Sequence, residues 1–222
     1  IVHHETASEP SEPSRTGYDF EGWYTSSDDG ITLIDKFDFS TAITGDLTLY
    51  AKWKVQYLTI HFDSNGSEES VEAINASFEQ IPITLPLVSR EGYYFTGWSE
   101  SASSEIAEYF AGYIINEENW QSGTLNLYAV WEIIKFSVDF VWNENGEILE
   151  SQFIEYGKTV TQPTAPSRTG YIFAGWYDPF NGSGDEEFDF STKVYTNYYL
   201  HAKWLPEKLT LTFHANGGVN SM

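Results

Sequence analysis

The sequence predicts a β-rich fold class in which one small domain recurs along the chain. The first of three observations behind this prediction is a repeated phrase: PSRTGYDFEGWY at 13–24 returns as SREGYYFTGW at 89–98 and as PSRTGYIFAGWY at 166–177. The second is an LYAKW-type segment, and the third is an alternating apolar run that follows this segment each time. Recurrence at a spacing of about 75 residues is typical of tandem-repeat architectures, so we expect about three copies.

The alternating runs predict the first strand of each copy. They occupy 58–62, 136–140 and 209–213 and read LTIHF, FSVDF and LTLTF. Apolar residues at every second position are the pattern of a strand with one buried face. In the third copy, 135–204, the sequence NENG at 143–146 comes next, and its Asn and Gly residues favour a hairpin turn. The segment ILESQFIEYG then returns as the second strand.

The remaining elements of the third copy are two further strands after an extended crossing. Pro163 and Pro166 exclude a long helix in the crossing, although a helical turn near 158–162 is compatible with the sequence. YIFAGWY at 171–177 is the expected third strand, and YYLHAKW, which ends at Trp204, is the expected last strand. Apolar residues again alternate along the last strand, so one of its faces is expected to be buried.

A core rich in aromatic residues is expected in each copy. A domain of about 75 residues buries only about 60% of its unfolded surface, so its core must be rich to be stable. Aromatic residues make up 17% of the chain, and each can bury about 150–250 Å². The sequence contains no cysteine, so no disulfide supports the core. The predicted core residues are Trp53, Trp131, Trp204, Tyr93, Phe95, Tyr171 and Phe173.

The third strand of each copy contains a Gly-Trp pair, at 22–23, 97–98 and 175–176. Strict alternation along the strand would place all three tryptophans on the solvated face, where they would be available for binding. Alternatively, each glycine forms a β-bulge that turns the following tryptophan inward. We favour the bulge, because a glycine directly precedes each of the three tryptophans.

The charge of the chain excludes several classes of partner. The formal net charge is −22, and the eleven Lys and Arg residues are scattered. Such a surface repels nucleic acid and anionic membranes, so neither is an expected partner. A solvated acidic surface that keeps a secreted protein soluble is the favoured interpretation, and recruitment of cations or a basic partner is the alternative. The sequence has no apolar run long enough to span a membrane, so no membrane insertion is expected in this segment.

The motif P-x-x-P-x-R-x-G-Y-x-F-x-G-W-Y, followed by F-D-F and L-Y-A-K-W, resembles the Listeria–Bacteroides repeat, also called the internalin B-repeat. The resemblance covers nearly the whole chain. It implies an α+β, β-rich fold of tandem β-grasp-like (ubiquitin/SUMO-like) small domains in an elongated array. It also implies a place on the bacterial cell surface or in a secreted protein. The family has no catalytic residues to carry over, so an enzyme is not expected.

The predicted domain boundaries follow from where each copy of the repeat begins and ends in the sequence. A repeat unit that lacks its first strand is expected at 1–53, and complete units are expected at 57–131 and 135–204. The first strand and hairpin of a further unit are expected at 209–222.

The middle copy departs most from the others. Its loop from Ser99 to Gly123 is longer and contains Trp120. In this loop, Ile115 is expected to fill the place that Phe37 and Phe188 occupy in the outer copies.

Two functions from different classes fit these features. The first is a semi-rigid stalk or spacer, because the linkers KVQY, EIIK and LPEK between copies are too short to flex freely. The alternative is an adhesive module that binds a glycan, or a host or matrix protein, through exposed aromatic residues and the variable middle loop.

Other copies of the same chain are a further expected partner. A unit without its first strand has unpaired strand edges, and every copy of the chain contains the matching strand at 209–213. Either the chain is a segment of a longer array, or the tail of one molecule completes the first unit of the next and builds an open filament. In the second case, the residues that pack together across two chains are Leu209, Leu211 and Phe213 with Tyr18, Phe20, Leu47 and Leu49.

No cofactor is expected, and the metal candidate is weak. Asp178, Asn181 and Asp185 place oxygen ligands at short spacing, as in calcium sites, but the strict calcium-loop motif is absent. None of the five histidines recurs in all copies. The acidic pairs at 68–69 and 186–187 lie in loops that differ between copies, which favours solvated charge over a glycosidase pair.

Overall fold

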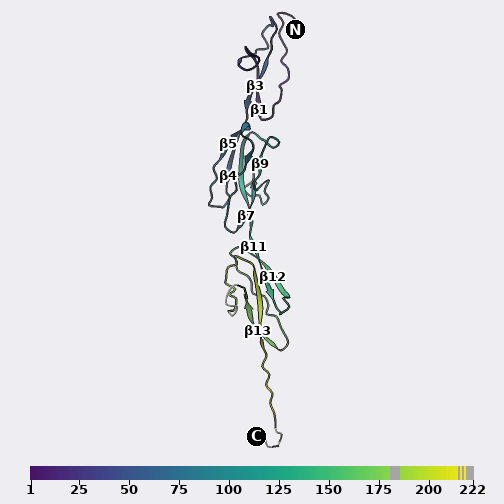
Figure 1. Cartoon of the computed structure of the whole chain (residues 1–222), viewed down its shortest axis with the longest axis vertical. Coiled ribbons are helices and arrows are strands. Elements are labelled where there is room, and N and C mark those ends of the chain that lie inside the picture. The colour runs from purple at the N-terminus through teal and green to yellow at the C-terminus, as the bar shows by residue number, and fades with distance from the viewer. Residues whose placement is uncertain (181–185, 215, 217, 219–222) are drawn as a thin grey trace. The chain divides into compact units, whose positions relative to one another are not determined.

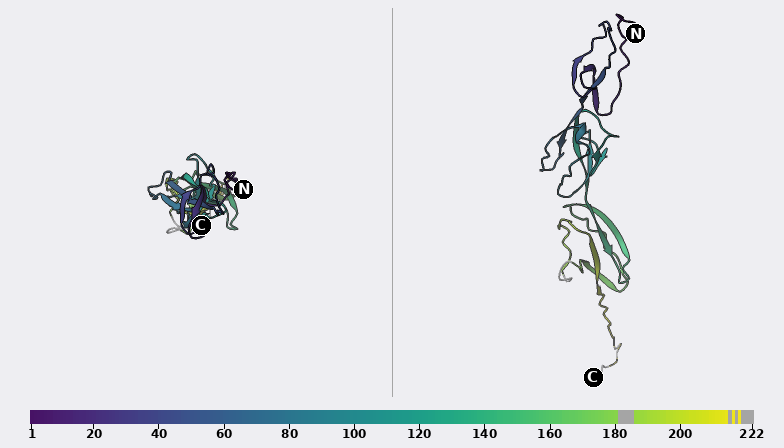
Figure 2. Two further views of the ribbon diagram at one scale, coloured as in Figure 1. Left: turned by 90° about the horizontal axis from the view of Figure 1, so that it is seen from above. Right: turned by 45° about the horizontal axis from the view of Figure 1, so that its top comes forward.

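The chain divides into two compact units, residues 1–132 and residues 133–222, in the computed structural model shown in Figure 1. The structure describes residues 1–180, 186–214, 216 and 218. The first unit holds the first and second repeats, and the second unit holds the third repeat. Strands dominate both units, as the two further views in Figure 2 also show.

Each repeat forms its own sheet. The first repeat has the sheet order β2-β1-β3, from β1 (Tyr18–Ser26), β2 (Leu33–Lys36) and β3 (Tyr50–Val55). The second has the order β5-β4-β10-β7-β8, from β4 (Tyr57–Asp63), β5 (Ile74–Ser77), β7 (Tyr93–Ser99), β8 (Tyr109–Phe110) and β10 (Gly123–Ile133). A two-stranded sheet beside it pairs β6 (Ile83–Thr84) with β9 (Ile114–Ile115). The third has the order β12-β11-β14-β13, from β11 (Lys135–Val141), β12 (Ile148–Glu155), β13 (Tyr171–Tyr177) and β14 (Tyr198–Pro206).

The α+β class expected from the family resemblance is wrong for this chain. The only helical element among the described residues is the short 3-10 helix η1 (Phe78–Gln80). Its start is fixed by the backbone N–H of Ser77, which donates to Oε1 of Gln80 at 2.7 Å. The helical turn that the sequence allowed near 158–162 does not form either. Prolines in the crossing segments remove backbone donors and disfavour the helical conformation of the preceding residue, so these segments stay extended.

The first and last strands of a complete repeat are parallel neighbours. In the second repeat β10 pairs with β4, with Leu127 opposite Phe62. In the third repeat β14 pairs with β11, with Leu200 opposite Phe140. The hairpin partner of each first strand runs antiparallel on the other side, as predicted from the NENG turn in the third repeat. The last strand therefore occupies the centre of the sheet.

The β-bulge at the Gly-Trp pairs is confirmed. The strand register shifts at this point between β1 and β3 and again between β13 and β14. Gly97 has a φ of 144° and Gly175 a φ of 118°, conformations that favour glycine. Trp98 and Trp176 are consequently turned into the core and are 0% exposed. The Gly-Trp tryptophans of the complete repeats are thus core residues, and they are not available for binding.

The predicted core residues take different positions. Phe95 packs between Trp98 and Trp131, with ring centroids 5.3 and 5.4 Å apart. Phe173 packs in the same way between Trp176 and Trp204, and Phe20 lies 5.5 Å from Trp53. Trp98 and Trp176 are fully buried, whereas the predicted core residues among these rings are half-buried at the edge of each core, as is Tyr93. The fully buried members of the cores include Ile60, Leu127, Val138, Phe140 and Leu200.

Tyr171 lies outside the core, contrary to the prediction. It is 40% exposed at the start of β13, and its ring packs against the guanidinium of Arg168, 4.2 Å from the ring centroid, instead of against the core. The same Arg–Tyr stack occurs in the other repeats, at 3.8 Å for Arg15 and at 4.0 Å for Arg90. In each case the Tyr backbone N–H donates to the Arg carbonyl at 3.1 Å. The S-R-x-G-Y motif therefore specifies a tight turn with a cation–π stack.

Glu108, and not Ile115, stands in the position of Phe37 and Phe188. The backbone N–H groups of Phe37 and Phe188 donate to the carbonyl of their Gly-Trp tryptophan at 2.8 and 2.7 Å. In the second repeat the equivalent bond, from Glu108 to the carbonyl of Trp98, is 3.0 Å long. Ile115 instead pairs with Ile83 in the small β6–β9 sheet. The sequence could not show this equivalence, because the loops that precede these residues differ in length.

Candidate strand-acceptor groove and repeat junction

The last strand of the first repeat is shorter than its equivalents. β3 begins only at Tyr50, whereas β10 extends over eleven residues and β14 over nine. Leu47 and Leu49 are equivalent by sequence to Leu125 and Leu127 in β10. Those two residues pair with Ile60 and Phe62 of the first strand of their repeat. The segment 45–49 has no such partner among the described residues and therefore stays outside the sheet.

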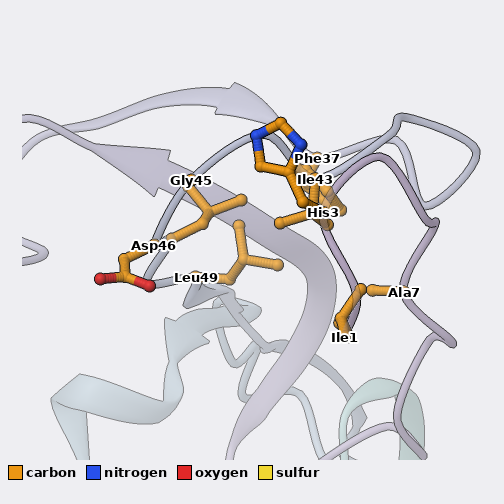
Figure 3. Close-up of a pocket in the computed structure, with 9 residues that line it drawn as sticks. Ile1, His3, Ala7, Phe37, Ile43, Gly45, Asp46 and Leu49 are labelled. Carbon is orange, nitrogen blue, oxygen red and sulfur yellow. The ribbon is translucent and has the colours of Figure 1, made fainter.

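A groove of about 400 Å³ lies beside this segment. Figure 3 shows the side chains gathered around it. Leu49 is only half-buried in the groove, while its equivalents Leu127 and Leu200 are 1% and 0% exposed. The groove thus lies where the first strand of a complete repeat covers the core. The lining residues are Ile1, His3, Ala7, Phe37, Ile43, Gly45, Asp46, Leu47 and Leu49.

Trp23 lacks an aromatic partner that its equivalents have. Trp98 lies 4.8 Å from Phe62 and Trp176 lies 4.9 Å from Phe140, measured between ring centroids. Both partners come from the first strand of their repeat. Trp23 packs on Phe20 at 5.5 Å but stays half-buried, since no first strand covers it among the described residues.

Leu209, Leu211 and Phe213 follow Trp204 at the spacing at which Phe136, Val138 and Phe140 follow Trp131. In the single chain these three side chains are 89%, 77% and 85% exposed. Residues 207–214 form no strand. The hairpin expected to follow within 209–222 lies largely outside the described residues. The segment therefore carries the apolar pattern of a first strand without a sheet to bury it.

Tyr18 and Phe20 do not line the groove, although they were expected at the strand-donation interface. These two residues pair with the end of β3 that is farther from the groove, where Tyr18 is opposite Val55. Phe20 is held between Trp23 and Trp53, at 5.5 Å from each. Of the predicted acceptor residues, only Leu47 and Leu49 lie at the groove.

Tyr18 instead belongs to the junction between the first and second repeats. Its ring lies 5.9 Å from that of Phe78, and its hydroxyl donates to Oε1 of Glu79 at 2.9 Å. This hydrogen bond to a carboxylate raises the pKa of Tyr18 above its usual value. Phe78 also lies against Gly17, where a Cβ atom would come within 2.0 Å of the ring.

Gln56 connects the two repeats at this junction. Its backbone N–H donates to the carbonyl of Gly17, and its carbonyl accepts from the N–H of Phe78, both at 2.9 Å. Its side-chain amide donates to Oδ1 of Asp19 at 2.7 Å. The linker residue is therefore hydrogen-bonded to the repeat before it and to the repeat after it, which restricts rotation at the junction.

No group of three or more His, Cys, Asp or Glu residues among those that the structure describes is placed to hold a metal. Of the weak calcium candidates, Asp178 accepts from the backbone N–H of Phe180 at 2.9 Å. Asn181 and Asp185 lie outside the described residues. No helix in the described part of the chain has the length and apolar character needed to cross a membrane.

Known sequences give the context of these repeats. A sequence model described as the Listeria-Bacteroides repeat domain matches residues 1–52, 58–130 and 136–203. A protein of Evansella cellulosilytica named as a Gly-rich membrane protein is 36% identical over 217 residues, which cover 92% of this chain and 24% of that protein. Internalin H of Listeria monocytogenes is 30% identical over 154 residues, which cover 69% of this chain and 24% of internalin H. The chain thus spans about a quarter of the length of these relatives.

Proposed function

Because the chain belongs to the Listeria-Bacteroides repeat domain family, we propose that it is a non-catalytic repeat segment of a bacterial surface or secreted protein and acts there as a semi-rigid stalk. The names of its relatives, a membrane protein and an internalin, support a place at the cell surface. Tandem copies of one small domain suit a spacer, because length grows with each copy.

The hydrogen bonds of Gln56 are the observation that carries the stalk proposal. A linker that bonds to both of its repeats cannot act as a flexible coil. The ring contact between Tyr18 and Phe78 adds side-chain packing across the same junction. This junction limits bending between the first and second repeats.

The sheet order supports a β-grasp-like relationship for the complete repeats. In the third repeat, with the order β12-β11-β14-β13, the first and last strands form a central parallel pair, and each of them has an antiparallel partner on its outer side. A parallel pair needs a crossover connection, and here the crossover is extended where a β-grasp domain has a helix.

A pair of spin labels tests the stalk directly. The chain has no cysteine, so Ser27→Cys and Ser103→Cys place one label in each of the first two repeats. Both positions are exposed. We expect a narrow distance distribution from pulsed electron paramagnetic resonance. Replacing the linker by Gly-Ser residues should broaden it, and a parent distribution as broad as that of the replaced linker would contradict the stalk.

The groove in the first repeat supports a second level of assembly, in which residues 209–213 of another copy complete the sheet. Leu211 and Phe213 would then occupy the places that Val138 and Phe140 hold in the third repeat, opposite the counterparts of Tyr198 and Leu200. Main-chain hydrogen bonds between the donated strand and segment 45–49 would provide the affinity. Burial of every second, apolar side chain of the donated strand would fix its register. Head-to-tail addition of this kind does not close, so it gives a filament.

Sedimentation of the 222-residue chain over a range of concentrations tests strand donation. We expect concentration-dependent association that Phe213→Asp and Leu49→Asp each abolish. Phe180→Asp is the matched control, because Phe180 is 75% exposed and remote in sequence from both segments. Fusing a copy of residues 209–218 before Ile1 should fill the groove within one chain and also abolish association. Equal association of the parent and Phe213→Asp would contradict donation.

A further inference from the structure

The second repeat contains a pocket at the position where the outer repeats place a phenylalanine. Phe37, Phe188 and Glu108 are equivalent by the hydrogen bond that each backbone N–H makes to the Gly-Trp carbonyl. In the third repeat the Phe188 ring packs against the core and lies 5.3 Å from the ring of Tyr198. Leu125 is the equivalent of Tyr198 in the second repeat. No aromatic ring from position 108 covers it there, because Glu108 is exposed.

The space beside Leu125 is a pocket of about 340 Å³, which is within the range of small-ligand sites. Leu58, Ile115 and Leu125 form its apolar floor. Leu58 and Ile115 are each only 3% exposed. The pocket therefore reaches the core of the repeat, and it is a feature of the longer middle loop.

Two tyrosines form walls at right angles. The ring centroids of Tyr109 and Tyr113 lie 5.1 Å apart, with an angle of 89° between the ring planes. The hydroxyl of Tyr109 donates to Oε1 of Glu100 at 2.7 Å, which fixes the orientation of this ring. Burial is the main cause that raises the pKa of Tyr109, so its phenol stays neutral under ordinary conditions. The rings of Tyr109 and Tyr113 thus line one cavity.

The charge at the mouth of the pocket is negative. Glu100 and Glu108 both line it, and none of its lining residues is Lys, Arg or His. Oε2 of Glu108 accepts from the backbone N–H of Glu100 at 2.9 Å and from the hydroxyl of Ser99 at 3.3 Å, which holds this carboxylate in place. Carboxylates beside aromatic rings attract a cation, and an apolar floor accommodates its alkyl groups.

We propose that this pocket binds the ammonium group of an organic cation, with the alkyl part on Leu58, Ile115 and Leu125 and the charge between the tyrosine rings and the two carboxylates. A lysine side chain and a choline-type headgroup share this chemistry. The net charge of −22 raises the local concentration of either ligand near the surface. The site is independent of strand donation, since it lies within one complete repeat.

Nitrogen-15 and proton chemical shifts of the whole 222-residue chain test the proposal. Choline and Nα-acetyl-lysine methylamide are the two cationic probes, and 3,3-dimethylbutanol is the uncharged isostere of choline. We expect at least one cation to shift the amide signals of Tyr109, Tyr113 and Asn119 and the isostere to leave them unchanged. The probe with the higher affinity identifies the source of the ammonium group. Signals of the third repeat serve as the internal control, because Phe188 stands at the equivalent position there.

Variants at Glu108 separate charge from shape. Glu108→Gln should weaken cation binding at least about tenfold, and Glu108→Phe, which restores the residue of the outer repeats, should abolish it while the fold is retained. Glu105→Gln is the matched control, because Glu105 is exposed and does not line the pocket. Equal binding of choline and its isostere, or no response to either cation, would overturn the proposal.

Discussion

The ring centroid of Trp176 lies 4.9 Å from that of Phe140, and this contact joins the third strand of the repeat to the first. Trp98 and Phe62 form the same pair in the second repeat, at 4.8 Å. Their position explains both the repeated Gly-Trp pair and the aromatic residue that ends each alternating run. The bulge turns the tryptophan inward, and the first strand supplies the ring that covers it.

Truncation of the Gly-Trp tryptophans should therefore have unequal effects. Trp176→Ala removes a fully buried side chain and should lower the free energy of unfolding by about 3–5 kcal/mol. Trp23→Ala should cost clearly less, because Trp23 is half-buried and lacks the partner from a first strand. Urea unfolding followed by amide signals of each repeat measures the two effects separately. Equal costs would show that the first repeat is packed as tightly as the third.

The bulge glycines should not tolerate a side chain. Gly97 has a φ of 144°, and a Cβ atom there would lie 2.2 Å from the carbonyl oxygen of Tyr109. Gly97→Ala should therefore destabilise the second repeat by about 3 kcal/mol or more. Gly112→Ala is the matched control, because Gly112 also has a positive φ, 80°, but open space around it. Its cost should be only about 1–2 kcal/mol, the strain of the backbone conformation alone. Thermal unfolding of the two variants would test this difference, and similar melting temperatures would contradict it.

The junction between the first two repeats should loosen when Gly17 acquires a side chain. Gly17 and Gly170 occupy equivalent positions in the S-R-x-G-Y turns of the first and third repeats, with φ of 76° and 79°. A Cβ atom at Gly17 would meet the Phe78 ring, whereas at Gly170 no atom lies within 4 Å. Gly17→Ala should therefore speed tryptic cleavage after Lys54 relative to the parent, while Gly170→Ala should leave this rate unchanged. An equal rate in Gly17→Ala and the parent would mean that Phe78 does not hold the linker.

The acid sensitivity of the fold should include contributions from two turn aspartates. Backbone N–H groups of Ser40 and Ser191 donate to Asp38 and Asp189, and these bonds hold the pKa of each carboxyl below 3.8. Because the folded pKa is lower than the unfolded one, the stabilisation is present above a pH of about 3.8 and is lost as the pH falls through the folded pKa. Carbon-13 titration of the side-chain carboxyls measures this pKa directly. A midpoint at or above 3.8 would contradict the structure.

Chelation should leave the fold unchanged. The described residues contain no cluster placed to hold a metal, and we propose that the protein works without a cofactor. The melting temperature should be the same in calcium and in excess chelator. A higher melting temperature in calcium than in chelator would instead establish the calcium site near 178–185, provided that Asp178→Asn or Asp185→Asn removes the difference.

The four strands of the third repeat and their order along the chain were predictable, because alternation and turn residues are local signals. The Gly-Trp bulge was predictable for the same reason: one glycine directly precedes the tryptophan that must turn inward. Pro163 and Pro166 predicted that the crossing of the third repeat has no long helix, and the structure agrees. The α+β class came from the family resemblance alone, and it was the part that the structure does not support.

The sites were harder to predict than the strands. Glu108 could not be matched to Phe37 and Phe188, because the match rests on one backbone hydrogen bond across loops of different length. Tyr18 was placed at the donation interface because it shares a face with core residues of its strand. The register of β1 with β3 puts it at the opposite end, next to Phe78. Sequence patterns state which face a side chain occupies, but only the register states where along the sheet it lies.

The parallel pairing of the first and last strands has a mechanical consequence. In the third repeat β11 enters at Lys135 and β14 leaves at Pro206, and the two strands run side by side in the same direction. A tensile load applied through the neighbouring segments would therefore pull these strands past each other. All hydrogen bonds between them would bear the load together, whereas strands joined at one end would unzip one bond at a time. Such a shear geometry favours resistance to extension whatever the equilibrium stability of the repeat, because forced unfolding follows the unfolding rate under load.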